Sequence, residues 1–315
     1  MEELTRTVER GSAVVLACPG TTEGVLAAVG AAYLAHADPD LVRLERRDLC
    51  QPRFGEEVVE VDEGERTVAL ARRVFDGFEA RAARDCGRTR GGSCPATCDY
   101  ACARRIIFAC ANDAPEMPEA VHRYLRLGFS RGVDVRDMLS HPDVVAFDAL
   151  ARRVSNECEH TRQFVRFSRL TDGSFFASFR PAVNTVPLTS GYFAARMRQD
   201  RFCLADPTHG LAAFHEKGRR GCSVIALDDV LMERLLEQGQ DVADEERYVR
   251  EMWRTFYRSM ELGGRDASQR GYDLRASWMP KRFWGGLTEL IPEDAEHKET
   301  PAPQRYQDTS SAALP

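Results

Sequence analysis

The sequence predicts an α+β protein in which N- and C-terminal helices cover a central antiparallel sheet. Two hairpin patterns support this prediction. In the first, Asp172-Gly173 separates two aromatic-rich runs, and this dipeptide is typical of tight turns that need positive φ angles. In the second, two apolar runs flank residues 207–210. We therefore expect a sheet of about four to six strands over residues 164–227.

The N-terminal region, residues 13–150, predicts a strand and several helices after a polar leader at residues 1–12. Val14–Ala17 is apolar enough for a short strand, and Pro19-Gly20 ends it before a helix. The glycine and lysine spacing of a phosphate-binding loop is missing here. Val58–Val61 indicates a second extended piece. Apolar residues then recur at helical spacing in four stretches, residues 70–82, 99–111, 118–128 and 140–158.

The C-terminal region, residues 151–290, contains the predicted sheet and further helices. Residues 245–262 show the clearest amphipathic stripe of the chain, and Gly263-Gly264 ends that helix. After residue 290 the chain becomes acidic and then rich in Pro, Gln, Ser and Thr. Residues 291–315 are therefore expected to form a disordered tail.

Composition narrows the class of protein. The chain has 315 residues, 43% of them apolar, and a net charge of -6, so a binding patch for a polyanion would have to be local. It opens Met-Glu-Glu without a basic segment followed by an apolar one, so we expect a soluble cytoplasmic protein that does not enter a membrane. Ten cysteines in that compartment indicate reduced thiols, metal ligands or core packing rather than disulfides.

Four cysteines form the first candidate site. Cys94, Cys98 and Cys102 are four residues apart, with Cys86 upstream. On a helix this spacing places the thiols on one face, where they could ligate zinc or an iron–sulfur cluster. Cysteine is also a common small core residue, so plain packing explains the same pattern.

Glu157, Asp206 and His209 form the second candidate site. Glu157 and His160 share one helical face, although an ion pair on the helix surface explains that spacing more simply. Asp206 and His209 flank a turn, so their side chains could meet and serve in acid–base chemistry or metal binding. A turn-capping Asp beside an exposed His is the simpler explanation.

Arginine-rich and aromatic stretches form the third candidate site. Six arginines lie between residues 152 and 180, and four basic residues alternate with four aromatic ones between residues 270 and 284. Guanidinium groups bind phosphates and aromatic rings stack on bases, so this composition suits single-stranded or distorted nucleic acid. Aromatic core residues with a solvated rim of arginines would explain the composition equally well.

Several segments together resemble an uncharacterised bacterial family labelled "probable DNA metabolism protein". They occur in the family's order over most of residues 13–290. The matching positions are His122–Phe129, Arg153-Val154, Glu157, Phe164–Phe167, Phe193, Arg196, Asp206, Tyr248, Trp253, Arg265 and Met279–Trp284. Members have no assigned activity, but they are usually encoded beside a radical-SAM protein linked to DNA modification or repair. Some are fused to a uracil-DNA-glycosylase-like domain, and the resemblance therefore implies a DNA-linked role.

The chain departs from this family pattern at several polar positions. Tyr192 stands where the family commonly has histidine, and His209 where it commonly has arginine. Glu159 occupies another position where relatives tend to have histidine, and His160 follows it. The cysteine-rich segment 86–102 resembles an insertion. These changes favour retained folding and partner binding over retained chemistry.

We therefore expect an accessory protein in DNA modification or repair that acts with a radical-SAM partner and contacts nucleic acid. The expected contacts are Arg166, Arg196, Arg265, Lys281 and Arg282 with phosphate groups, and Trp284 stacked on a base. One alternative is an enzyme acting on a DNA base or nucleotide, which requires Glu157, Asp206 and His209 to converge. The other is a metal-binding module built on the four cysteines.

Overall fold

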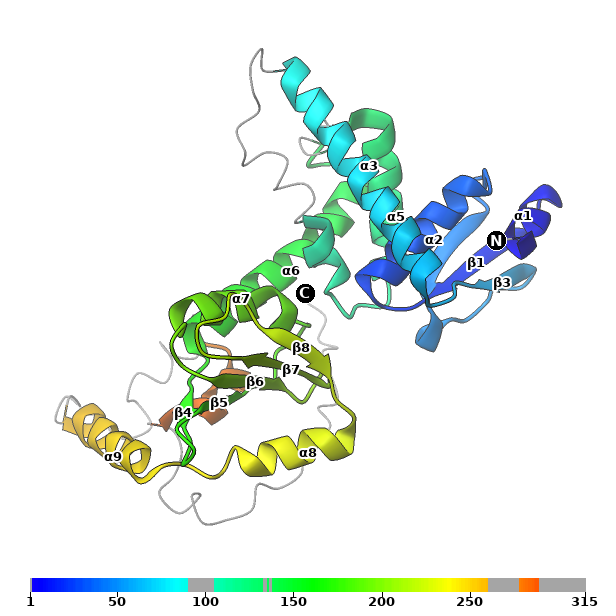
Figure 1. Cartoon of the computed structure of the whole chain (residues 1–315). Coiled ribbons are helices and arrows are strands. Elements are labelled where there is room, and N and C mark those ends of the chain that lie inside the picture. Colours follow the sequence, from blue (N-terminus) through cyan, green and yellow to red (C-terminus); the bar gives the residue numbers. More distant parts are fainter. Residues whose placement is uncertain (1, 90–104, 133–134, 136–137, 260–277, 289–315) are drawn as a thin grey trace, which may run out of the picture.

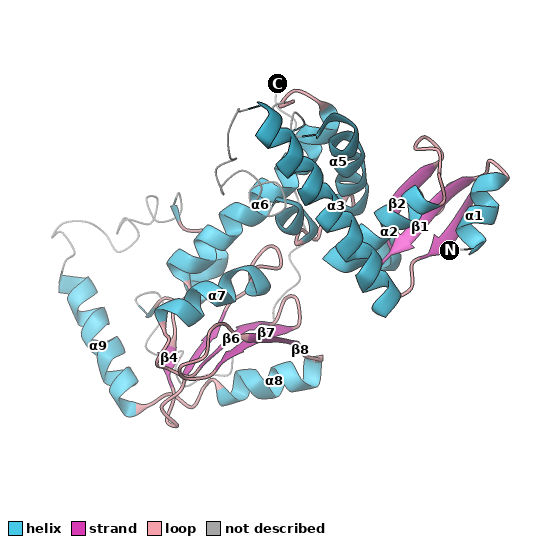
Figure 2. Ribbon diagram, turned by 45° about the horizontal axis from the view of Figure 1, so that its top comes forward, coloured by secondary structure: helices cyan, strands magenta, loops and turns pink. Residues whose placement is uncertain are grey.

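The computed structural model describes residues 2–89, 105–132, 135, 138–259 and 278–288. This part of the chain contains a three-stranded sheet near the N-terminus and a five-stranded sheet in the C-terminal half. A group of helices lies between the two sheets, and the long helix α6 (Pro142–Phe164) runs from that group to the second sheet (Figures 1 and 2). The predicted α+β class is thus confirmed.

The first sheet is parallel and has the order β2-β1-β3. Its strands are β1 (Ala13–Cys18), β2 (Val42–Arg46) and β3 (Glu56–Glu60). β1 is the predicted first strand, and five of its six residues are buried because it lies between two partners. β2 was not predicted, and it is followed by a short 3-10 helix, η1 (Arg47–Leu49).

Helices on both sides complete the first core. The N-terminal residues form helix α1 (Glu2–Glu9), whose Leu4 is buried. Helix α2 (Thr22–Leu34) is the helix predicted after Pro19-Gly20; Thr21 caps it, and nine of its residues are buried. Helices α3 (Glu65–Thr89) and α5 (Met117–Arg131) enclose it with α6, and together they build the larger hydrophobic core.

The second sheet has the order β4-β5-β6-β7-β8. Its strands are β4 (Ser168–Arg169), β5 (Phe175–Ser178), β6 (Phe202–Asp206), β7 (Leu211–His215) and β8 (Ser223–Ala226). Both predicted hairpins are present, and Gly173 has the positive φ angle (80°) that its turn requires. One pair, β5 with β6, is parallel because helix α7 (Val186–Arg196) carries the chain back across the sheet.

Two helices follow the second sheet, α8 (Asp229–Gln238) and α9 (Asp244–Ser259). α9 has the predicted apolar stripe, but Met252, Trp253 and Phe256 remain about half exposed. The short 3-10 helix η4 (Lys281–Gly286) returns to the sheet and buries Phe283 in the second core. Among the described helices, none combines the length and apolar composition needed to cross a bilayer. The predicted disordered tail lies outside the described residues.

Candidate functional site

Asp206 and His209 meet at the turn between β6 and β7. Asp206, the last residue of β6, is fully buried, and its Oδ1 accepts hydrogen bonds from the backbone N–H groups of Thr208 (2.9 Å) and His209 (3.3 Å). Its other oxygen, Oδ2, lies 2.5 Å from His209 Nδ1. The turn-capping role and the predicted contact with His209 therefore occur together.

A second carboxylate approaches His209 from the other side. His209 Nε2 lies 2.7 Å from Oδ2 of Asp113, which lies in the loop before α5. Asn112 fixes this loop, because its side-chain amide donates to the Leu150 carbonyl of α6 and its Oδ1 accepts from the Ala114 N–H. Arg46, at the end of β2, donates to the Asp113 carbonyl at 2.9 Å. The loop thus links the first sheet to the turn that carries His209.

The two carboxylates determine the protonation state of His209. Burial alone lowers the pKa of the imidazole, but its hydrogen bonds to Asp113 and Asp206 outweigh that effect and raise the pKa to about 9. His209 is therefore an imidazolium at neutral pH, with both ring nitrogens donating to carboxylates. In this arrangement it forms an ionic bridge and can release a proton, but it cannot act as a general base.

Glu157 belongs to a separate network. It is 3% exposed on α6, and its carboxylate pairs with both Nε (2.7 Å) and Nη2 of Arg282. It also accepts a hydrogen bond from the Ala182 N–H at 2.7 Å, and His160 Nδ1 lies 3.6 Å away. Burial favours the neutral acid, but the contacts with Arg282 and Ala182 outweigh it and hold the pKa of Glu157 below its ordinary value.

Within the described part of the chain, no hydrogen bond or ion pair joins Glu157 to Asp206 or His209. The three predicted acid–base residues therefore form two networks instead of one. Each network satisfies its own charges, Glu157 through Arg282 and His209 through Asp206 and Asp113.

The residues predicted to contact nucleic acid fall into two groups. Arg166 is exposed two residues after α6, and Arg196 is exposed as the last residue of α7. In η4, Lys281 is exposed, whereas Arg282 is bound to Glu157 and the Trp284 indole donates to the Met279 carbonyl at 3.0 Å. The guanidinium of Arg282 and the indole N–H of Trp284 thus hold η4 in place. Arg265 lies outside the described residues.

Further cations surround Arg196 and extend this surface. Here "basic face" denotes Arg166, Arg196, Arg198, Lys217 and Arg219, which are all exposed. The Gly218 N–H donates to the Arg198 carbonyl at 2.8 Å, which holds the β7–β8 loop against the end of α7. No described acidic side chain forms an ion pair with any of the five residues.

Two aromatic contacts bring the end of α6 onto the same side as α7. The Phe167 and Phe193 rings lie 5.3 Å apart between centroids, beside Arg166 and Arg196 respectively. The exposed Tyr192 ring lies 5.8 Å from the Arg162 guanidinium carbon. Sequence reasoning missed the contribution of Lys217 and Arg219, although the run Lys-Gly-Arg-Arg between two strands signals an exposed basic loop.

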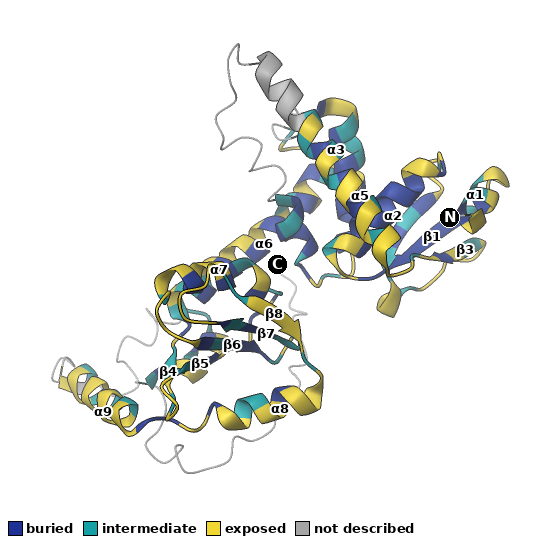
Figure 3. Cartoon of the chain, in the orientation of Figure 1, coloured by how far each residue is buried: buried dark blue, intermediate teal, exposed yellow. Residues whose placement is uncertain are grey.

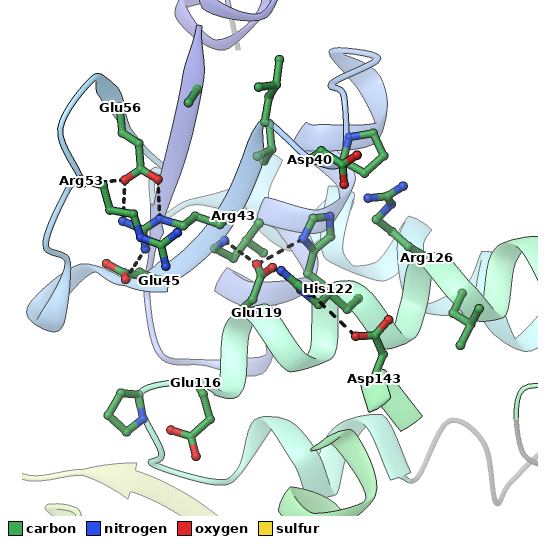
Figure 4. A pocket seen from close by; sticks show the side chains of 18 of the residues that line it. Asp40, Arg43, Glu45, Arg53, Glu56, Glu116, Glu119, His122, Arg126 and Asp143 are labelled. Carbon is green, nitrogen blue, oxygen red and sulfur yellow. Dashed lines mark hydrogen bonds and ion pairs between the residues drawn. The ribbon is translucent and has the colours of Figure 1, made fainter. Parts of the chain in front are cut away.

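A hollow of about 840 Å³ lies between β2 and α5, and its wall is rich in charged side chains (Figure 4). Arg43 binds both oxygens of Glu56 at 2.7 Å, and Glu119 accepts from the Leu44 N–H (2.9 Å) and Arg123 Nε (2.6 Å). Burial raises the pKa of Glu119, but these partners and His122 outweigh it and lower the pKa to about 2. The Leu44–Glu119 hydrogen bond attaches the edge strand β2 to α5, and the Arg43–Glu56 pair joins β2 to β3.

The predicted cysteine site lies largely outside the described residues. Cys94, Cys98 and Cys102 are not described, and of Cys86 only the backbone in α3 is described. Elsewhere in the described part of the chain, no group of three or more His, Cys, Asp or Glu side chains could hold a metal ion. The zinc or iron–sulfur site stays a prediction. Six described cysteines are free thiols, at positions 18, 50, 110, 158, 203 and 222.

Comparison with known families finds one matching domain in the chain. A family model described as a domain of unknown function, DUF4130, matches residues 115–289, which is more than half of the chain. The chain belongs to the DUF4130 family. The DUF4130 region begins just before α5 and contains Glu157, Asp206, His209 and the basic face, whereas Arg46 and Asp113 precede it.

Other comparisons add little to the DUF4130 match. No curated protein matches the chain. A solved structure titled as the DHH domain of a member of a family of ribosomal proteins is similar at 12% identity, over 75% of this chain and 88% of that one. The TM-score is 0.30, which is too low to support any inference about fold or function.

Proposed function

We propose that this DUF4130 protein is an accessory factor in DNA modification or repair that binds nucleic acid through its basic face and acts with a radical-SAM partner. The basic face is the observation that supports nucleic-acid binding. Five exposed cations come from the ends of α6 and α7 and from the β7–β8 loop, and none forms an ion pair with a described acidic residue, in a chain whose net charge is -6. The family resemblance described above supports the DNA-linked role and the radical-SAM partner.

Binding through these cations should depend on salt concentration in a defined way. Lys and Arg side chains that contact phosphates release condensed counterions, so the binding constant falls as salt rises. For each tenfold rise in salt, the logarithm of the binding constant falls by about 0.9 per phosphate contact on duplex DNA and by about 0.7 on single strands. The exposed Tyr192 beside Arg162 adds a ring on which an unpaired base could stack. Single-stranded or distorted DNA is therefore the expected ligand.

The test is fluorescence anisotropy with labelled single-stranded and duplex oligonucleotides over a salt series. The variant R166Q/R196Q should weaken binding and reduce the salt slope for single strands by about 1.4. The variant R72Q/R73Q removes the same charge from two exposed arginines on α3 and should bind like the unmodified protein. Absence of binding by the unmodified protein at low salt, or equal losses in both variants, would overturn the proposal.

The partner requires its own measurement. The protein should capture the radical-SAM protein encoded beside it, and comparison with and without DNA shows whether the DNA bridges the two proteins. An association that survives nuclease treatment supports a direct contact. Failure to recover the adjacent-gene product in either condition would remove the accessory role while leaving DNA binding intact.

One observation favours an enzymatic alternative. The buried Asp206 carboxylate and the His209 imidazolium form the kind of hydrogen-bonded pair that supplies a proton in acid catalysis. An enzyme acting on a DNA base or nucleotide would need Asp113 to leave His209 Nε2, so that a substrate atom could take its place. The variant D113N should then increase turnover of a base or nucleotide substrate while H209Q abolishes it. Without activity in either variant, the pair has a structural role only.

A further inference from the structure

Strand β8 forms an open edge of the second sheet. It is hydrogen-bonded to β7 on one side, and it is the last strand in the order of the described sheet. All four of its residues are exposed, including Val224 at 39% and Ile225 at 47% (Figure 3). Proteins usually protect such an edge with a charged residue, a proline or a bulge, and Ser223–Ala226 contains none of these.

The charges that flank β8 are opposite in sign at its two ends. Arg219 and Arg220 precede the strand, and Asp228 and Asp229 follow it. Asp228 caps α8 through a hydrogen bond from the Leu231 N–H at 2.8 Å, so its carboxylate is occupied. Arg220 and Asp229 are both exposed, and neither forms an ion pair with a described residue. Each is therefore available to a partner outside the chain.

We propose that two copies of this chain pair antiparallel along β8 about a two-fold axis that passes between Val224 and Ile225. In this register Ser223 faces Ala226 of the second copy. Arg220, three residues before the strand, then lies at the same end as Asp229 of the second copy, which begins α8 three residues after its strand. A two-fold axis repeats each contact, so both ends of the strand pair carry an attractive Arg–Asp contact. The two five-stranded sheets then become one continuous sheet.

The residues beside the edge suit this arrangement. Val230 and Leu231, at the start of α8, are 59% and 47% exposed and extend the apolar surface beyond the strand. Pairing gives hydrogen-bond partners to the outward backbone N–H and C=O groups of β8, which bond to no described residue, and also covers these side chains. A foreign extended peptide would satisfy the same backbone groups, but the opposite charges at the two ends make the edge complementary to itself.

Sedimentation equilibrium of the full chain without DNA tests this inference. The unmodified protein should be a dimer, and R220E or D229R alone should raise the dimer dissociation constant by about tenfold because two ion pairs become repulsive. The double variant R220E/D229R should restore the original constant. R72E, an equal change of charge on α3, is the matched control and should leave the constant unchanged.

Three outcomes would overturn this inference. A monomer at all concentrations up to about 100 µM would exclude self-pairing at useful affinity. A dimer that ignores both single variants would place the contact elsewhere. Failure of R220E/D229R to restore dimerisation, with an unchanged circular dichroism melt, would show that Arg220 and Asp229 do not meet across the interface.

Discussion

His209 couples the stability of the protein to pH. Its folded pKa of about 9 lies above the ordinary value of 6.5, so protonation stabilises the folded state. The stabilisation is fully present below pH 6.5, where the unfolded chain is protonated as well, and it is lost as the pH rises through 9. The difference corresponds to on the order of 3 kcal/mol for this mostly buried side chain, as an upper estimate.

The variant H209Q should remove this dependence. Urea denaturation at pH 6, 7.5 and 9.5 should show the unmodified protein losing free energy of unfolding across that range, and H209Q losing much less. At pH 9.5 the two proteins should approach each other in stability. An equal fall in both proteins would mean that another group is responsible.

At the scale of residues, sequence separation decided what could be predicted. Asp206 and His209 flank one turn, so their contact follows from local geometry. Asp113 is 96 residues from His209, and Arg282 is 125 residues from Glu157, so no local sequence pattern predicts either contact. The prediction that Arg282 contacts phosphate did not consider that its guanidinium could be occupied by a buried carboxylate.

At the scale of elements, local turn chemistry made the two hairpins predictable, whereas the parallel pairs left no such signal. β1 pairs with β2 in the register Val14–Val42 and with β3 in the register Val15–Val58, so each partner is distant in sequence. β2 alternates buried Val42 and Leu44 with polar residues, but over five residues this pattern is too short to distinguish a strand from a loop. The parallel β5–β6 pair depends likewise on the crossover through α7.

The packing of α3 against α5 depends on a glycine. A Cβ atom at Gly128 would lie 2.4 Å from Phe78 Cε2, whereas a Cβ at Gly77 on α3 would lie 3.8 Å from its nearest neighbour, Phe129 Cε1. Alanine favours a helix over glycine by about 1 kcal/mol. G77A should therefore stabilise the protein by roughly 0.5–1 kcal/mol.

G128A should instead destabilise the protein by about 1–3 kcal/mol, because overpacking outweighs the gain in helix propensity. Chemical denaturation of both variants provides the comparison. Stabilisation by G128A would show that the Phe78 ring moves away at little cost, and that the close approach of the two helices is not required.

At the scale of the whole molecule, α6 belongs to both hydrophobic cores. Val144, Phe147 and Val154 are buried in the first core, and Phe164 packs against the second. A continuous helix that crosses both cores makes their unfolding cooperative, because neither core can open without losing part of its own wall.

Breaking α6 near the end of its first-core stretch should separate the unfolding of the two cores. Ser155 is exposed three residues before Cys158, the last residue of α6 in the first core, and S155P removes a backbone hydrogen bond and introduces a clash that costs about 3 kcal/mol or more. Unfolding followed by circular dichroism and by tryptophan emission should coincide in the unmodified protein and in S155A, and should diverge in S155P. All three tryptophans lie after residue 250, so emission reports on the C-terminal half. Coincident curves in S155P would mean that other contacts couple the cores.

The described thiols have a practical consequence for chemical labelling. Burial raises the pKa of Cys18, Cys110 and Cys203 to about 12, and the pKa values of Cys50 and Cys222 are also raised, while Cys158 is fully buried. Thiolate, the form that reacts with maleimide, is therefore scarce near neutral pH at the first five sites, and burial keeps the reagent away from Cys158. Any cysteine that is alkylated rapidly belongs to the other four, Cys86, Cys94, Cys98 and Cys102. A cysteine that ligates a metal becomes reactive only after the metal is removed. The increase in the number of rapidly formed adducts after treatment with a chelator, counted by mass spectrometry, therefore gives the number of cysteines that bound metal.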